Sequence, residues 1–244
     1  MNILQVPTSQ GSLEHNKGCE LAPAAILKEL RQQVPTTIVA VNQNDIDATQ
    51  QAIYNAATQD CIILGGDHSI TQAAFQAFAK RYKKPGLIMF DAHPDAMSNF
   101  KTTHEDFIHV LLAEGTLKPE HLVQIGIRAA DIQEKQFLQK NNIKTYSPEQ
   151  LVNIEYACDD IMEYLNTCDG IYITIDIDSL DPANAPGTGY LEPNGLTPRE
   201  LFYLVKRFRK MKNYKMADIV EVNPTNDINN ITVRTAAMLV KELL

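Results

Sequence analysis

The sequence lacks the features of several large classes of protein. It contains no block of basic residues, and its formal net charge of −8 disfavours binding to nucleic acid or to an anionic membrane surface. No apolar run approaches the length of a membrane span. Residues 1–7 have neither a charged region nor a long apolar one, so we expect no signal peptide. None of the four cysteines belongs to a Cys-x-x-Cys pair, which favours a protein of the reducing cytoplasm.

Apolar runs of strand length alternate along the 244 residues with segments of helical periodicity. This alternation predicts one α/β domain over residues 1–244, with a mostly parallel sheet of about eight strands and helices on both faces. The expected strands are 3–6, 36–41, 61–64, 86–90, 122–127, 143–146, 171–175 and 217–222. The expected helices are 23–30, 45–59, 70–82, one containing 108–112, 131–141, 148–166, 197–208 and 231–244. A closed (β/α)₈ barrel fits the same pattern.

The segment Phe90-Asp91-Ala92-His93-Pro94-Asp95 follows directly on an expected strand. Alternate residues of an extended segment point the same way, so Asp91, His93 and Asp95 can converge on one point. Two carboxylates and an imidazole suit a divalent metal ion, and the excess of oxygen favours a harder ion than structural zinc. A loop with solvated acids is the simpler interpretation of this segment alone.

Three further polar motifs follow apolar runs. They are Gly65-Gly66-Asp67-His68-Ser69, Asp176-Ile177-Asp178-Ser179-Leu180-Asp181-Pro182 and Glu221-Val222-Asn223-Pro224. Ligands of an open α/β sheet bind beyond the carboxyl ends of its strands, so we expect the four motifs to form one site. The candidate metal ligands are His68, Asp91, His93, Asp95, Asp176 and Asp178. Six ligands are too many for one catalytic ion with an open position and suit two ions that share carboxylates.

Two such ions can hold and acidify one bridging water. Four aspartates balance two divalent ions, so a bound hydroxide and a nearby Glu221 leave the site negative. A negative site should attract a cation rather than a phosphate. The adjacent segment 181–195 has no apolar period, and long loops at strand ends are commonly functional.

Some of these side chains also have structural interpretations. His104 alone fits a histidine in a surface loop. Asp67 and Asp181 are interpreted as structural, because the ligand count does not need them. Glu221 alone fits a solvated acid, although its position beyond a fourth strand favours a function.

The order of the four motifs resembles the ureohydrolases, which include arginase and agmatinase. The resemblance covers nearly the whole chain and begins at residues 18–26, which are similar to that family's N-terminal Gly-Pro-x-x-Ile element. It implies an eight-stranded parallel αβα sandwich rather than a barrel. It also implies a binuclear manganese enzyme that cleaves the guanidino C–N bond of arginine or of a related compound such as agmatine, releasing urea and an amine. Such proteins commonly form homo-oligomers, either trimers or hexamers.

The resemblance also implies a role for each matched residue. One Mn²⁺ would be held by His68, Asp91, Asp95 and Asp176. The other would be held by Asp91, His93, Asp176 and Asp178, so that Asp91 and Asp176 bridge. Asp95 would also relay a proton, Glu221 would pair with the substrate guanidinium, and His104 would shuttle protons to the leaving amine.

The loop that would hold the far end of the substrate departs from arginase. It covers residues 96–103, is shorter than the arginase loop, and has Met97 in place of an asparagine. Ser98 and Asn99 are its candidate substrate contacts. These differences weaken the expectation of arginine as the substrate.

The other candidate substrate contacts resemble arginase in part and agmatinase in part. Asp131 and Glu134 resemble the arginase residues that meet the substrate α-amino group. The loop 185–189 is closer to agmatinase, and Tyr190 stands where a small polar residue is usual, so it is expected to narrow the pocket. The choice among guanidino compounds stays open.

Three other functions compete with this interpretation. A binuclear phosphoesterase places Asp-x-His before its Gly-Asp motif and needs a Gly-Asn-His segment, which is absent here. A formiminoglutamase- or deacetylase-like amide hydrolase shares a similar fold, and the deacetylase type binds a single zinc ion. A non-catalytic metal-binding relative would have lost ligands or Glu221. Two bound metal ions per chain would favour the ureohydrolase, one the deacetylase type, and none the non-catalytic relative.

Overall fold

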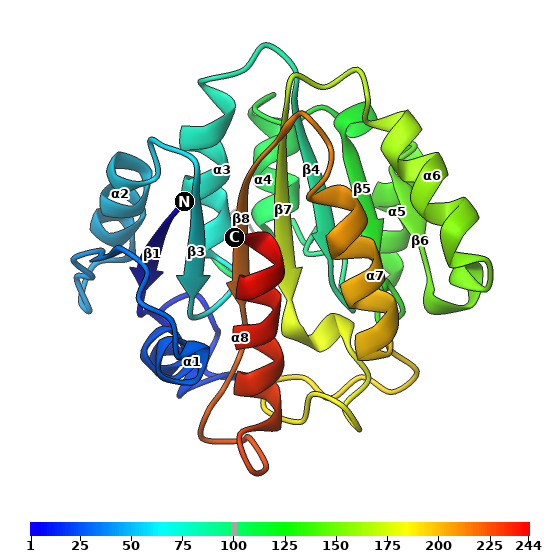
Figure 1. Cartoon of the computed structure of the whole chain (residues 1–244). Helices are drawn as coiled ribbons and strands as arrows, with labels where there is room; N and C mark the ends of the chain where they lie inside the picture. The colour runs from blue at the N-terminus through cyan, green and yellow to red at the C-terminus, as the bar shows by residue number, and fades with distance from the viewer. Residues whose placement is uncertain (99–101) are drawn as a thin grey trace.

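The computed structural model describes residues 1–98 and 102–244 and contains one eight-stranded sheet in the order β2-β1-β3-β8-β7-β4-β5-β6 (Figure 1). The strands are β1 Asn2–Val6, β2 Thr36–Ile38, β3 Cys61–Gly65, β4 Pro85–Phe90, β5 Leu122–Ile125, β6 Lys144–Tyr146, β7 Gly170–Asp176 and β8 Tyr214–Val220. Every neighbouring pair is parallel. The sheet is open, with β2 and β6 as its edges, so the predicted sandwich is confirmed over the barrel.

Helices cover both faces of the sheet. They are α1 Ala22–Leu30, α2 Ile46–Ala56, α3 Ile70–Ala79, α4 Phe107–Ala113, α5 Ile132–Lys140, α6 Ile154–Tyr164, α7 Pro198–Phe208 and α8 Ile231–Leu243. One hydrophobic cluster joins α1, α6, α7 and α8 to one face, and a second joins α2, α3, α4 and α5 to the other. The result is the expected three-layer arrangement. No helix in the described part of the chain is long and apolar enough to cross a membrane.

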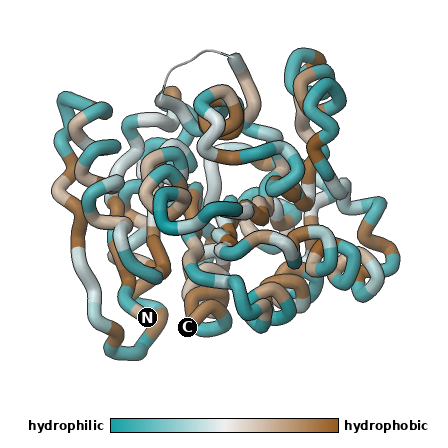
Figure 2. The backbone as a smooth tube through the Cα atoms, turned by 90° about the horizontal axis from the view of Figure 1, so that it is seen from above, coloured by the Kyte–Doolittle hydropathy of each residue, from teal (hydrophilic) through white to brown (hydrophobic). Residues whose placement is uncertain are grey.

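The alternation of side chains along β4 shows why the central strands are apolar throughout. Ile88 and Phe90 pack into the cluster that includes α7, whereas Leu87 and Met89 pack into the opposite cluster. A parallel strand between two helical layers is buried on both faces and therefore needs apolar residues at consecutive positions. Figure 2 shows the corresponding banding of hydrophobic and hydrophilic residues along the surrounding helices.

Several boundaries differ from the sequence prediction, and in two of these cases a local cap or backbone conformation interrupts the periodic segment. The expected helix 148–166 is divided into a 3₁₀ turn, Pro148–Leu151, and α6. Asn153 ends the first piece and caps the second, since its side chain accepts a hydrogen bond from Tyr156 N–H. The expected strand 122–127 stops at Ile125 because Gly126 adopts a left-handed φ of 99°.

The topology brings the four polar motifs together. Strands β3, β8, β7 and β4 are consecutive neighbours in the sheet, and each is followed by one of the motifs. All four run in one direction, so their carboxyl ends meet at one edge, drawn at the bottom of Figure 1. The fold therefore places residues from four distant segments at a single site.

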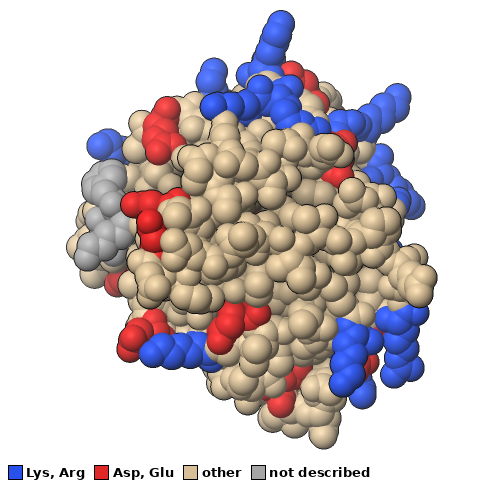
Figure 3. Space-filling model, turned by 90° about the vertical axis from the view of Figure 1, so that its left-hand side faces the viewer, with Lys and Arg blue, Asp and Glu red and all other residues tan. Residues whose placement is uncertain are grey.

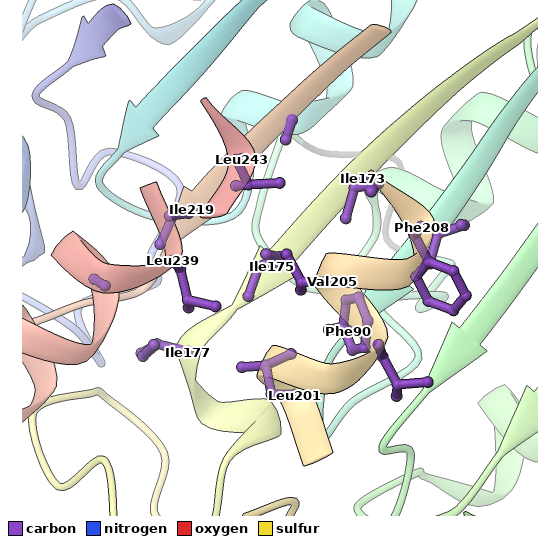
Figure 4. Packing of buried hydrophobic residues seen from close by; sticks show 14 of the residues in the cluster. Phe90, Ile173, Ile175, Ile177, Leu201, Val205, Phe208, Ile219, Leu239 and Leu243 are labelled. Carbon is purple, nitrogen blue, oxygen red and sulfur yellow. The ribbon is translucent and has the colours of Figure 1, made fainter. Parts of the chain in front are cut away.

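Packing of α7 against β4 is expected to stabilise this edge. Phe208 is fully buried, and its ring centroid lies 6.0 Å from that of Phe90, the residue before Asp91 (Figure 4). Phe208→Ala should lower the free energy of unfolding by about 3–5 kcal/mol, because it leaves a cavity. Denaturant titration measures the change. The exposed Arg199→Ala on the same helix is the control and should change it by less than about 0.5 kcal/mol. Equal stability of both variants would contradict this packing role.

Candidate metal centre

The motif side chains line one cavity of about 370 Å³ at the carboxyl edge of the sheet. The acidic cluster consists of the six predicted ligands, His68, Asp91, His93, Asp95, Asp176 and Asp178. Five of them are buried, and His93 is partly exposed. Glu221, His104 and Tyr190 line the same cavity. The structure therefore brings together every candidate ligand that the motif spacing predicted.

His68 is the centre of the first group of ligands. Its Nδ1 lies 3.0 Å from Asp91 Oδ2, 3.0 Å from Asp95 Oδ2 and 3.3 Å from Asp176 Oδ2. Asp95 reaches this point from a left-handed backbone conformation with φ of 49°, an unfavourable state for a residue with a side chain. Three carboxylates from two strand ends thus converge on one ring nitrogen.

His93 is the centre of the second group. Its Nδ1 lies 3.1 Å from Asp178 Oδ2 and 3.5 Å from Asp91 Oδ1. Asp91 belongs to both groups and offers one oxygen to each. Asp176 presents Oδ2 to His68, while its Oδ1 accepts a hydrogen bond from Asp178 N–H (2.8 Å). Asp91 Oδ1 likewise accepts from His93 N–H (2.7 Å), so it is the membership of both groups that supports Asp91 as the bridging ligand more directly than Asp176.

A hydrogen-bond chain behind His68 fixes the state of its ring. The Thr174 hydroxyl donates to Asp218 Oδ1 (2.5 Å), so it must accept from His68 Nε2 (2.7 Å). Asp218 is fully buried and also accepts from the hydroxyls of Tyr172 and Thr71. When the ring is neutral, this chain keeps the proton on Nε2, so that the lone pair of Nδ1 points at three carboxylates. This donor set fits a cation held between them.

The pKa values show the same need for positive charge. Burial lowers the pKa of His68, but its contacts with Asp176, Asp91 and Asp95 raise it well above the usual range. Burial and then the charge of Asp91 raise the pKa of Asp95 strongly. Burial and then the charges of Asp178 and Asp91 do the same for Asp176. The carboxylates repel one another, and a divalent ion in each group would relieve that repulsion.

Glu221 and His104 form a second buried pair beside the acidic cluster. Glu221 Oε1 accepts from His68 N–H (2.6 Å) and lies 3.3 Å from His104 Nδ1. Burial lowers the pKa of His104, but contact with Glu221 raises it to about 9. His104 Nε2 is buried and has no hydrogen-bond partner among the described residues. The pair therefore offers a carboxylate and an imidazole nitrogen next to the candidate metal site.

Three residues of this site were missed by the sequence analysis. Asn16 donates from Nδ2 to Glu221 Oε2 (2.6 Å) and comes from an N-terminal segment read only as a polar loop. Thr174 and Asp218 were read as parts of apolar strands. The signal that could have found them is a single polar residue at a buried position of an apolar run.

The predicted substrate contacts have different outcomes. Asp131 and Tyr190 line the cavity, and the Tyr190 ring centroid lies 5.2 Å from that of His93. Glu134 also lines it, but its two oxygens accept hydrogen bonds from Ala96 N–H and Asp131 N–H (3.0 Å each). Ser98 is exposed and is not among the described residues that line the cavity, and Asn99 lies outside the described residues.

Asp67 has the structural role expected for it. Its Oδ2 accepts from Gly11 N–H (3.1 Å) and its Oδ1 from Ser69 N–H (3.0 Å). Its own N–H donates to Thr8 O, which packs so closely that a side chain at Gly66 would collide with it. These contacts fix the N-terminal loop against the end of β3 and thereby position His68.

Comparisons with known proteins agree with this geometry. The model of the arginase family matches residues 1–244. An arginase of Staphylococcus aureus strain COL is 34% identical over 221 residues, which are 83% of this chain and 72% of that protein. An agmatinase of Citrobacter koseri is 37% identical over 193 residues, which are 78% of this chain and 60% of that protein.

The three-dimensional comparison extends over the whole chain. The crystal structure of arginase from Bacillus subtilis superposes with a TM-score of 0.93 at 27% identity, covering 100% of this chain and 98% of that one. The match includes the single eight-stranded parallel sheet and its surrounding helices. With the family model matched from end to end, the chain belongs to the arginase family of metal-dependent amidinohydrolases.

Proposed function

We propose that this chain is a binuclear manganese hydrolase that cleaves the guanidino C–N bond of a small cationic compound, releasing urea and an amine. The observation that carries the proposal is the acidic cluster, in which two histidine–aspartate groups share Asp91 at one end of a cavity that also holds Glu221 and His104. By the same family resemblance, we propose a cytoplasmic homo-oligomer.

The acidic cluster contains the ligands for both ions. His68, Asp91, Asp95 and Asp176 would hold the first, and His93, Asp91 and Asp178 the second, with Asp176 also reaching the second if it bridges. Ligand sets rich in carboxylate suit manganese better than a soft ion. Bound there, the ions would activate a water molecule and polarise the substrate.

The protein side chains bind and orient the substrate. The carboxylate charge that the two ions do not neutralise favours a cationic substrate over a neutral or anionic one. We expect Glu221 to pair with the planar guanidinium, because its carboxylate lines the cavity beside the acidic cluster. His104 Nε2 has no hydrogen-bond partner among the described residues, so it can hand a proton to the departing nitrogen.

The alternative functions make different demands on the same residues. A deacetylase-like hydrolase with a single ion has no use for a second histidine–aspartate group around His93. A formimino hydrolase would use the same two ions but would release formamide from its substrate. A non-catalytic relative would have no need to keep both His104 and Glu221 in the cavity.

Thr174 tests whether His68 is a metal ligand. Thr174→Val removes the acceptor for His68 Nε2–H, so the ring loses its fixed orientation. Manganese affinity should fall about 10–100-fold, as is usual for such supporting partners. Calorimetric titration of metal-free protein measures the change, and circular dichroism checks the fold. Thr174→Ser keeps the hydroxyl and should bind nearly as well as the wild type. Unchanged affinity in the valine variant would contradict the role of His68.

Turnover tests the reaction itself. The manganese-loaded protein is offered arginine, agmatine, 4-guanidinobutyrate and formiminoglutamate, and urea or formamide is measured. We expect urea from at least one guanidino compound. His104→Asn should keep both ions and lose about 10²–10⁴-fold in rate. Glu221→Gln should lose more, because the guanidinium loses its charged anchor.

The exposed Glu155→Gln is the control for these variants and should keep full activity. Formamide without urea would support the formimino alternative. If both ions are bound and no substrate is turned over, the proposed function is wrong.

A further inference from the structure

The outer part of the cavity, beyond the acidic cluster, is itself acidic. Among the described residues it is lined by Glu105, Asp131, Glu134 and Glu192, with Arg128 as the single basic side chain. Glu134 is committed to two backbone amides. No lysine or arginine lies within ion-pair distance of the other three among the described residues. Glu192 lies 3.8 Å from His93 Nε2, and Glu105 lies 3.9 Å from His104 Nε2.

Arg128 does not offset this negative charge for a ligand. Its guanidinium is directed at backbone carbonyl groups, which belong to Gly126, Asp178, Glu192 and Pro193. These bonds tie the loop 181–195 to the end of β5. A substrate carboxylate would therefore find no free lysine or arginine among the described residues of the cavity.

Glu105 is the outer carboxylate with the most defined position. It follows His104, and its Oε1 lies 3.9 Å from His104 Nε2. The Tyr190 hydroxyl donates to the same oxygen at 3.5 Å, and the Tyr190 ring lies 5.8 Å from the His104 ring. The side chain of Glu105 is 35% exposed, so it is partly desolvated and still open to the cavity. Glu105 also lines the cavity, where a ligand can reach its carboxylate.

We infer that Glu105, oriented by Tyr190, binds a second positive group at the far end of the substrate. The preferred substrate is then a guanidino compound whose other end carries an amine and no carboxylate. This inference rests on the proposed function and adds a specificity-determining residue to it. A carboxylate at that end would face Glu105, Asp131 and Glu192, and like charges brought together cost binding energy.

Figure 3 shows where basic side chains lie on one face of the molecule. Many lysine and arginine side chains lie along the upper edge, at the end of the sheet opposite the cavity, and others lie lower on this face near aspartate and glutamate side chains.

Two guanidino compounds with the same carbon chain test the inference. Agmatine carries a terminal amine, whereas butylguanidine ends in a methyl group. Glu105→Gln should lower kcat/KM for agmatine about tenfold or more and change that for butylguanidine by less than about twofold. Tyr190→Phe should act in the same direction with a smaller effect. The exposed Glu155→Gln should change neither.

Binding of 1,4-diaminobutane to the manganese-loaded protein gives a measurement independent of turnover. Calorimetry should show about tenfold weaker binding in Glu105→Gln than in the wild type. The inference is wrong if Glu105→Gln loses kcat/KM equally on agmatine and butylguanidine, or loses none on agmatine. In either case the proposed function still stands, because butylguanidine is turned over. If no guanidino compound is hydrolysed, the proposed function is wrong. Diamine binding that is unchanged in Glu105→Gln would show that the inference is wrong as well.

Discussion

Buried negative charge is the constraint on which the rest of the site depends. The four aspartates of the acidic cluster are almost completely buried, and no lysine or arginine pairs with them among the described residues. Unpaired ionised carboxylates are costly to bury. The imidazoles of His68 and His93 are the nearest groups that could offset them, yet the Thr174–Asp218 chain places the His68 proton on the opposite ring nitrogen. Cations held between the two groups would relieve this repulsion, which is why the arrangement suits metal ions.

The same constraint relates the metal centre to the substrate. Carboxylates continue outward from the acidic cluster to Glu221 and then to Glu105, and Arg128 is occupied with backbone carbonyls. A long cation is therefore favoured along the whole cavity. Tyr190 contributes both shape and orientation, because its ring lies against the histidines while its hydroxyl meets Glu105.

The sequence predicted the fold and the grouping of the six candidate ligands because both follow from local patterns. Alternating apolar segments specify the layers, and Asp91, His93 and Asp95 are spaced for one side of an extended chain. Asn16 has no such pattern, since it meets Glu221 only through the fold, 205 positions along the chain. Glu134 was expected at the substrate, but one of its oxygens caps α5 by accepting from Asp131 N–H, and the other accepts from Ala96 N–H in a distant loop. The predicted boundaries of a helix were wrong where a single capping residue, such as Asn153, interrupts a longer periodic segment.

The central claim is that two ions share Asp91 in the acidic cluster. Crystals grown with manganese, measured at the manganese absorption edge, test it most directly through the anomalous difference map. The account predicts two peaks about 3.5–4 Å apart, one beside His68 Nδ1 and one beside His93 Nδ1, with Asp91 between them. Contact of Asp176 with both peaks would add it as a second bridge. A single peak, or two peaks that do not share Asp91, would contradict the account.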